Sequence, residues 1–205
     1  MLRGRHSWLK ILIVVILTAS ASGCTFIFQK GRRTDVERIS RLKSELSEMD
    51  QAKQELEDKL QKEIADKQVK VEMLEKGLVI TLVAEVLFDS GKADLRNESF
   101  DTLGKVANVL NTTVKDLNVG IEGHTDNDPI KHSGWKSNWE LSANRALSVL
   151  HRLIDEESVA PQRLSIIGYG EFRSVANNDT REGKQKNRRV EIVILPKEIK
   201  KVEAE

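Results

Sequence analysis

The sequence predicts an α+β fold in which helices cover one face of a small mixed sheet, preceded by a signal peptide and a long charged helix. Three observations lead to this prediction. A short aliphatic run near the N-terminus ends in small residues and a cysteine. Residues 34–76 contain no Gly, Pro or aromatic residue, whereas residues 77–196 alternate β-rich runs with amphipathic helical patterns. Such alternation is typical of helices packed on a sheet.

Composition narrows the class of protein before any motif is considered. The chain of 205 residues is 32% charged and only 4% aromatic, which is too polar for one compact core of that length. Its formal net charge of +1 offers no excess of basic groups for the phosphates of a nucleic acid. The single cysteine, Cys24, excludes an intramolecular disulfide and a Cys-rich zinc site. We therefore expect a partly non-globular chain with no nucleic-acid partner.

The first 23 residues have the pattern of an export signal. Arg3, Arg5 and Lys10 precede the unbroken aliphatic run Ile11–Leu17, and small residues follow it up to Cys24. The segment Ala-Ser-Gly-Cys at the end resembles the lipobox of bacterial lipoproteins. That resemblance implies removal of residues 1–23 and a lipid on Cys24. Because Thr rather than Asp follows the cysteine, it also implies an outer-membrane protein that faces the periplasm.

An uncleaved anchor in the inner membrane is the alternative for the same segment. Ile11–Phe28 contains no charge and approaches the ~20 residues that span a bilayer. Thr18, Ser20 and Ser22 lower its hydrophobicity in the middle, where a membrane span should be most apolar. We favour the lipoprotein, and we expect residues 24–33 to form a short tether.

Residues 34–76 are predicted to form a coiled-coil stalk. Acidic side chains repeatedly precede basic ones by four residues, which is the favourable order on a helix. Apolar residues recur at heptad spacing, with a change of phase after Leu60. They are Ile39, Leu42, Leu46, Met49, Leu56, Leu60, Ile64, Val71 and Leu74. This pattern predicts a spacer helix that can dimerise, and a single solvated helix is the alternative.

The globular domain is expected to span residues 77–196, followed by a charged tail at 197–205. Its elements follow the order β-α-β-α-β-β. Ser137 and Glu140 form a capping-box pattern at the start of the second helix. The expected strands are 78–83, 119–123, 164–168 and 189–195, and the expected helices begin near Asn97 and Ser137.

Motifs of catalysis and of metal binding are missing from this sequence. There is no HExxH pattern and no G-x-S-x-G elbow, and Ser90-Gly91-Lys92 lacks the first glycine of a phosphate loop. His124 follows a predicted strand, where a hydrogen-bonded histidine is more common than a metal ligand. We therefore expect a protein that is not an enzyme and that has no metal and no cofactor.

Two further blocks carry a family resemblance. They are Gly-His-Thr-Asp-Asn at 123–127 and Asn-Trp-Glu-Leu-Ser-Ala-Asn-Arg-Ala at 138–146. Together with the segments at 87–95 and 187–192, they resemble the peptidoglycan-binding domain of the OmpA/MotB family. The resemblance covers about residues 78–195, with four blocks in the family's order.

This resemblance implies a site for diaminopimelate, the amino acid of the peptidoglycan stem peptide. Asp126 would take its ammonium and Arg145 its carboxylate, without a covalent bond. Without the resemblance, a structural ion pair between Asp126 and Arg145 would be the simpler interpretation. The same resemblance implies secondary contacts or loop supports at Phe88, Asp89, Thr125, Asn127, Asn138, Leu141 and Arg189.

Residues Pro129–Lys136 lengthen the loop between Asp126 and Arg145. They leave open whether Trp135 or Trp139 contacts glycan, and Trp139 fits helix-start packing equally well.

Two functions compete for the whole chain. The first is a lipoprotein that tethers the outer membrane to the cell wall. The second is a MotB-like stator or envelope-complex subunit held by an uncleaved N-terminal helix. A stator requires a protonatable carboxylate within its membrane span, and Ile11–Phe28 contains none. The sequence therefore favours the tether.

Overall fold

A computed structural model describes residues 34–131 and 133–197 of the chain. The predicted signal peptide, the lipidation residue Cys24, the tether and residues 198–205 of the tail lie outside the described residues. The chain divides into two compact units, Met1–Leu46 and Ser47–Glu205. Within the described ranges, no helix combines the length and the apolar character needed to cross a bilayer.

The described part of the first unit, residues 34–46, is helical. Its apolar side chains lie largely in solvent, and Ile39 and Leu46 are each 53% exposed. These residues occupy the predicted heptad positions. Homodimerisation through them therefore stays a prediction.

The second unit begins earlier than the predicted boundary at residue 77. Residues 47–59 are helical and the short helix α2 (Gln61–Ala65) follows. Met49, Ala52, Leu56 and Leu60 are buried and belong to the core of the domain. The apolar stripe of an amphipathic helix buries itself against the nearest apolar surface, which here is the chain's own domain. Those heptad positions are therefore not available for dimerisation.

The predicted continuation of the helix to residue 76 is wrong. Lys67 has a φ of 57° after the end of α2, and β1 (Val69–Leu74) then pairs antiparallel with β2 (Gly77–Val83). Val69 and Val71 are buried while Lys70 between them is exposed, which is the period of a strand. Pairing also satisfies the backbone groups along the edge of β2, which a helix would leave open.

The sheet has five strands in the order β1-β2-β5-β3-β4. β3 (Asn118–His124) pairs parallel with β4 (Leu164–Gly168) and antiparallel with β5 (Arg189–Leu195). The β2–β5 pair is antiparallel as well, so the sheet is mixed. The predicted α+β class is confirmed, with β1 as an additional edge strand.

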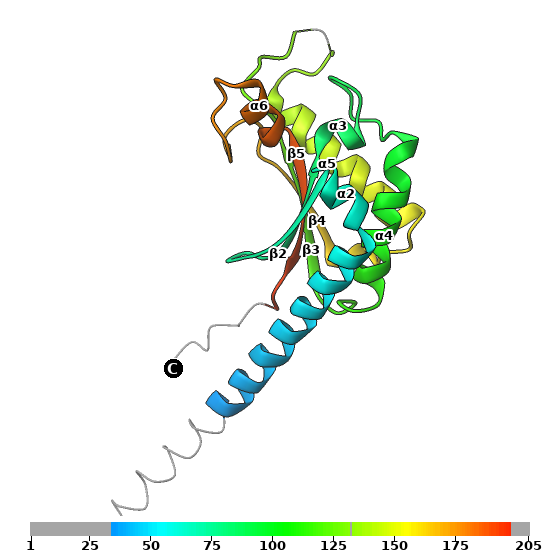
Figure 1. Ribbon diagram of the computed structural model, residues 1–205, viewed down its shortest axis with the longest axis vertical. Helices are drawn as coiled ribbons and strands as arrows, with labels where there is room; N and C mark the ends of the chain where they lie inside the picture. The colour runs from blue at the N-terminus through cyan, green and yellow to red at the C-terminus, as the bar shows by residue number, and fades with distance from the viewer. Residues whose placement is uncertain (1–33, 132, 198–205) are drawn as a thin grey trace, which may run out of the picture. The chain divides into compact units, whose positions relative to one another are not determined.

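Helices α4 (Phe100–Asn111) and α5 (Asn138–Asp155) lie on one side of the sheet, as Figure 1 shows. α3 (Ala84–Leu87) follows β2, and 3₁₀ turns occupy Asn97–Ser99 and Pro161–Arg163. α6 (Arg181–Asn187), which was not predicted, lies where β5 begins. The Ser137 side chain accepts a hydrogen bond from Glu140 N, so the predicted cap of α5 is confirmed.

Candidate functional site

A cavity of about 630 Å³ opens where β3 ends, between the α3 segment and the start of α5. Seven of the nine side chains predicted for ligand contact line it. They are Phe88, Asp89, Thr125, Asp126, Asn138, Leu141 and Arg145. The fold therefore brings together residues that are far apart in the sequence.

The other two predicted residues do not line this cavity. Asn127 is exposed, and Arg189 is buried on the opposite face of the sheet. Arg188 lines the cavity in place of its neighbour. Strand alternation explains the exchange: Val190 belongs to the helix-side core, so residue 188 shares its side and residue 189 does not. Counting back from the apolar residues of this strand would have identified Arg188.

A close contact between β3 and α5 places Asp126 beside Arg145. A Cβ atom on Gly123 would lie 2.0 Å from the backbone oxygen of Ser142, a separation that real Cβ atoms do not show. Glycine at this position allows the end of β3 to press against the helix. Asp126 follows the strand and Arg145 follows on the helix, so both side chains enter one cavity.

Asp126 is buried and already paired. Its Oδ2 accepts a hydrogen bond from Arg188 Nη1 at 2.5 Å, and its Oδ1 accepts one from the backbone N–H of Asp128 at 3.1 Å. Arg188 also donates to Glu85 Oε1. Burial alone would lower the pKa of Arg188, but the hydrogen bonds that it donates to the Asp126 and Glu85 carboxylates outweigh burial and raise that pKa. Arg188 therefore fixes the orientation of the Asp126 carboxylate.

Arg145 is buried without a matching carboxylate. Its Nε donates to the backbone oxygen of Lys92 at 3.0 Å, and its guanidinium carbon lies 5.2 Å from the centroid of the Phe88 ring. Among residues 34–131 and 133–197, no carboxylate forms an ion pair with it. Burial lowers the pKa of Arg145 to about 10. The alternative interpretation, a structural ion pair between Asp126 and Arg145, is therefore not what the structure shows, and the guanidinium remains open to an anion in the cavity.

Polar contacts hold the walls of the cavity in place. Asn138 Nδ2 donates to Asp128 O at 3.0 Å and to Glu171 Oε2 at 2.7 Å. The backbone N–H of Thr125 donates to Gly170 O at 2.9 Å. These hydrogen bonds of Asn138 and Thr125 connect the loop after β3 to the loop after β4.

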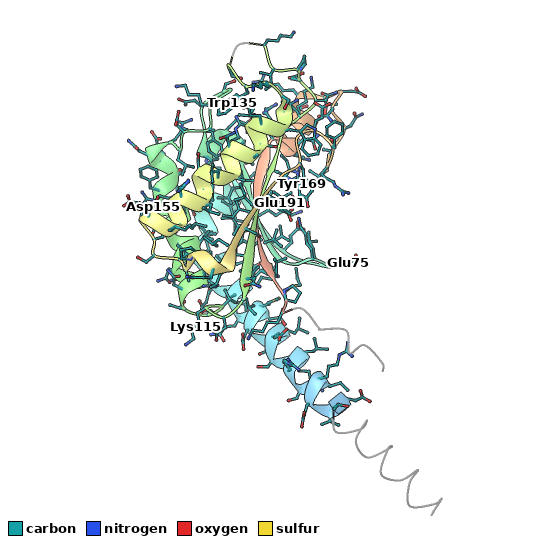
Figure 2. All side chains as sticks on the ribbon, turned by 180° about the vertical axis from the view of Figure 1, so that it is seen from behind. Glu75, Lys115, Trp135, Asp155, Tyr169 and Glu191 are labelled. Atoms are coloured by element: carbon teal, nitrogen blue, oxygen red, sulfur yellow. The ribbon has the colours of Figure 1, made fainter. Side chains whose placement is uncertain are left out.

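The lengthened loop forms the outer wall. Pro129, Ile130, Lys131 and Ser133 line the cavity. The indole nitrogen of Trp135, labelled in Figure 2, donates to Gly91 O at 2.8 Å. This bond joins the loop to the segment that carries Asp89, so Trp135 has a structural partner.

The charges around the cavity are mixed. Its walls carry the carboxylates of Glu85, Asp89, Asp126 and Asp128 and the cations of Lys131, Arg145 and Arg188. Glu85 Oε2 has no hydrogen-bond partner within the described ranges. Near-balanced charge of both signs suits a zwitterion better than a polyanion. We refer to Glu85, Asp126, Arg145 and Arg188 as the pocket cluster.

A second group of buried charges lies on the opposite face of the sheet; its Glu191 is labelled in Figure 2. Lys76 Nζ donates to Glu122 Oε2 at 2.6 Å and to Glu191 Oε2 at 2.5 Å. Arg189 Nε donates to Glu191 Oε1 at 2.5 Å. These four residues and His124, which stacks on Tyr169, are the back-face cluster.

The back-face cluster is the place in the described chain that most resembles a metal site. Ligand atoms of Glu122, His124 and Glu191 all lie within 4.8 Å of one another. Neither ring nitrogen of His124 has a hydrogen-bond partner in the described chain, so the expected hydrogen-bonded histidine is not found. Lys76 and Arg189 already neutralise both carboxylates. We assign the cluster to the stability of the sheet.

Comparison with known proteins identifies the domain. A model of the OmpA family matches residues 87–188. Motility protein B of Bacillus subtilis (strain 168) is 39% identical over 150 residues, which cover 73% of this chain and 57% of that protein. The uncharacterized protein YtxE of the same strain is 34% identical over 166 residues, or 79% of this chain and 68% of that protein. The chain belongs to the OmpA family.

A solved structure supports the same assignment for the OmpA-family domain. The cell wall anchor of the T6SS from Pseudomonas aeruginosa matches with a TM-score of 0.61 and 34% identity, over 68% of this chain and 96% of that one. The chain therefore carries an OmpA-like peptidoglycan-binding domain. Its match to motility protein B of Bacillus spans little more than half of that protein.

Proposed function

We propose that this OmpA-family protein is a non-catalytic anchor that holds the cell wall through diaminopimelate of the peptidoglycan stem peptide. The observation that carries the proposal is Arg145, a buried guanidinium that faces the cavity without an ion-pair partner in the described chain. A buried charge is costly unless it is paired, so this position favours a ligand that supplies a carboxylate.

The two charged groups of the ligand match cavity side chains of opposite charge. The side chain of diaminopimelate carries one carboxylate and one ammonium on the same carbon. Arg145 takes the carboxylate through its planar fork. The ammonium lies against Asp126, whose Oδ1 accepts only a backbone N–H, and against Glu85, whose Oε2 has no hydrogen-bond partner in the described chain. The proposal needs no bond to form or break.

Sedimentation with purified sacculi tests this function. Full-length protein should pellet with sacculi, and Arg145→Ala and Asp126→Ala should each remain in the supernatant while keeping the wild-type circular dichroism. Asp155→Ala, an exposed carboxylate at the far end of α5, is the matched control and should pellet normally. Binding retained by both site variants would reject the site. Release of muropeptides by the purified protein would reject the non-catalytic role.

The attachment to the membrane forms the second part of the proposal. The lipobox-like segment supports a lipid on Cys24, with the outer membrane tethered to the wall from the periplasmic side. Similarity to motility protein B of Bacillus supports the alternative, a subunit of a motor or envelope complex held in the inner membrane by an uncleaved helix. The intact mass of the mature protein distinguishes them, because a lipidated chain begins at Cys24 and an uncleaved one retains residues 1–23.

A further inference from the structure

Two exposed aromatic side chains, adjacent in sequence to Asn138 and Glu171, stack on each other. The rings of Trp139 and Phe172 have centroids 5.2 Å apart and planes inclined by 23°. The two side chains are 50% and 64% exposed, and Val175 in the same loop is 62% exposed. Only 4% of the chain is aromatic, so two large rings facing solvent together form an unusual surface.

This stack is firmly connected to the cavity. Trp139 directly follows Asn138, whose side chain lines the cavity and donates to Glu171 Oε2 at 2.7 Å. Phe172 directly follows Glu171. The Cα atoms of residues adjacent in sequence are about 3.8 Å apart. Each aromatic residue therefore lies about 3.8 Å, Cα to Cα, from one partner of the Asn138–Glu171 hydrogen bond.

The loop that carries Phe172 is built to approach the start of α5. Gly170 has a φ of +56°, and a Cβ atom there would lie 3.3 Å from Trp139 N. The N–H of Gly170 donates to Ser142 Oγ at 2.9 Å. A glycine in the left-handed region therefore lets the loop dock on the helix and bring Phe172 against Trp139.

The chemistry of the proposed ligand provides an occupant for these rings. Diaminopimelate is the third residue of a stem peptide that is itself attached to an amino sugar of the glycan strand. Two extended residues span about 7 Å, so the sugar of the bound muropeptide stays close to the cavity. One face of a sugar ring presents C–H groups, which pack on the electron-rich face of an aromatic ring.

We infer that Trp139 and Phe172 form a sugar subsite, on which the amino sugar that carries the bound stem peptide stacks. This inference rests on the proposed function, because the peptide in the cavity brings the sugar to the rings. It also gives Trp139 a role beyond packing at the start of the helix. A protein partner on the same surface is the competing occupant, and the experiment below includes it.

Isothermal titration of the full-length protein with two soluble ligands tests the subsite. One ligand is a stem tripeptide that ends in diaminopimelate, and the other is the same tripeptide attached to its disaccharide. The wild type should bind the disaccharide form about fivefold more tightly, which corresponds to about 1 kcal/mol. Trp139→Ala and Phe172→Ala should abolish this difference and leave the affinity for the tripeptide unchanged. Trp139→Phe should retain most of it.

Two control variants separate this inference from the proposed function. Arg145→Ala should lose both ligands, whereas Leu74→Ala, which removes an exposed apolar side chain on β1, should keep the preference for sugar. Equal affinity of the wild type for both ligands, or an unchanged preference in Trp139→Ala and Phe172→Ala, would overturn the subsite and leave the function standing. Loss of self-association in these variants without a change in the preference would assign the rings to a protein interface. Failure of the wild type to bind either ligand would reject the function itself.

Discussion

The pocket cluster and the back-face cluster lie on opposite faces of the same sheet, and they treat buried charge differently. In the back-face cluster, Lys76 and Arg189 neutralise Glu122 and Glu191. In the pocket cluster, Arg188 satisfies Asp126, but Arg145 has no carboxylate partner within the described chain. A closed set of charges stabilises a fold, whereas a charge left open favours a ligand.

The directions of the pKa shifts agree with this contrast. Burial alone would raise the pKa of Glu191, but hydrogen bonds from Lys76 and Arg189 outweigh it and lower that pKa. For Arg145 burial prevails, and its pKa falls to about 10. The back-face cluster therefore compensates for the loss of hydration on its own, while the pocket cluster requires an anion.

Replacement of Arg145 should produce the largest effect. We expect Arg145→Leu to lower the affinity for the diaminopimelate tripeptide by at least about 100-fold, or about 2.7 kcal/mol. The melting temperature of this variant should stay equal or rise, because the substitution removes a buried charge that has no ion-pair partner in the described part of the chain. Titration calorimetry and thermal unfolding measure the two quantities.

A second arginine on α5 provides the control for that variant. Arg152 pairs with Glu157 at 2.8 Å and stacks over the Phe100 ring at 4.1 Å. Arg152→Leu should therefore lower the melting temperature and keep the affinity. If Arg145→Leu destabilised the protein as much as Arg152→Leu does, the distinction between a buried charge without an ion-pair partner and a paired one would fail.

Lys76 should show the opposite behaviour to Arg145. Lys76→Met leaves Glu122 and Glu191 without their shared cation, so we expect a loss of about 2 kcal/mol in the free energy of unfolding. This is less than the ~3–5 kcal/mol for breaking a fully buried pair, because the Lys76 side chain is 37% exposed and partly screened. Urea denaturation measures the loss, and the affinity for the tripeptide should not change.

The exposed neighbour Lys70 is the matched control for Lys76. It pairs with Glu72 on the surface, and Lys70→Met should change the free energy of unfolding by less than about 0.5 kcal/mol. A loss of tripeptide binding in Lys76→Met would show that the back-face cluster supports the cavity, and the two faces would no longer be independent.

His124 should make the protein sensitive to mild acid. Burial lowers its pKa from 6.5 to about 3, so between these values the unfolded chain binds a proton that the folded protein does not. Stability therefore falls as the pH drops below 6.5, by about 2 kcal/mol at pH 5. His124→Leu should remove most of the change in the free energy of unfolding between pH 6.5 and pH 5. His151→Leu, at an exposed histidine, should keep the wild-type slope, and an equal slope in all three proteins would contradict the assignment.

Local patterns predicted the fold class, and the family resemblance, which short local blocks carry, implied seven of the residues that line the cavity. Asp126 lies in a short block at the end of a strand, and the Ser137 cap marks the start of the helix that carries Arg145. β1 was missed because Val71 and Leu74 fit a heptad as well as a strand. Only the pairing with β2, a contact between strands, separates the two.

The remaining differences also depend on contacts between distant residues. The pairing of Trp139 with Phe172 requires the loop after β4 to fold back on α5, which no local pattern indicates. Burial of Leu56 and Leu60 in the domain, instead of in a dimer, depends on which apolar surface the helix meets. Arg188 is the exception, because the alternation of β5 would have been sufficient to place it on the cavity side, although the resemblance pointed to Arg189 instead.

The smallest effect is expected for a pair at the rim of the cavity. Lys184 Nζ contacts Asp128 Oδ1 at 2.7 Å, and the side chain of Asp128 is 60% exposed. This hydrogen bond raises the pKa of Lys184, but solvent and salt screen a pair in this position. Lys184→Ala should therefore leave the melting temperature and the tripeptide affinity unchanged within error, in calorimetry at low and at physiological salt. A tenfold loss of affinity would show that the Lys184–Asp128 pair holds the loop after β3 in place. Ligand binding at Arg145 would then depend on an exposed contact.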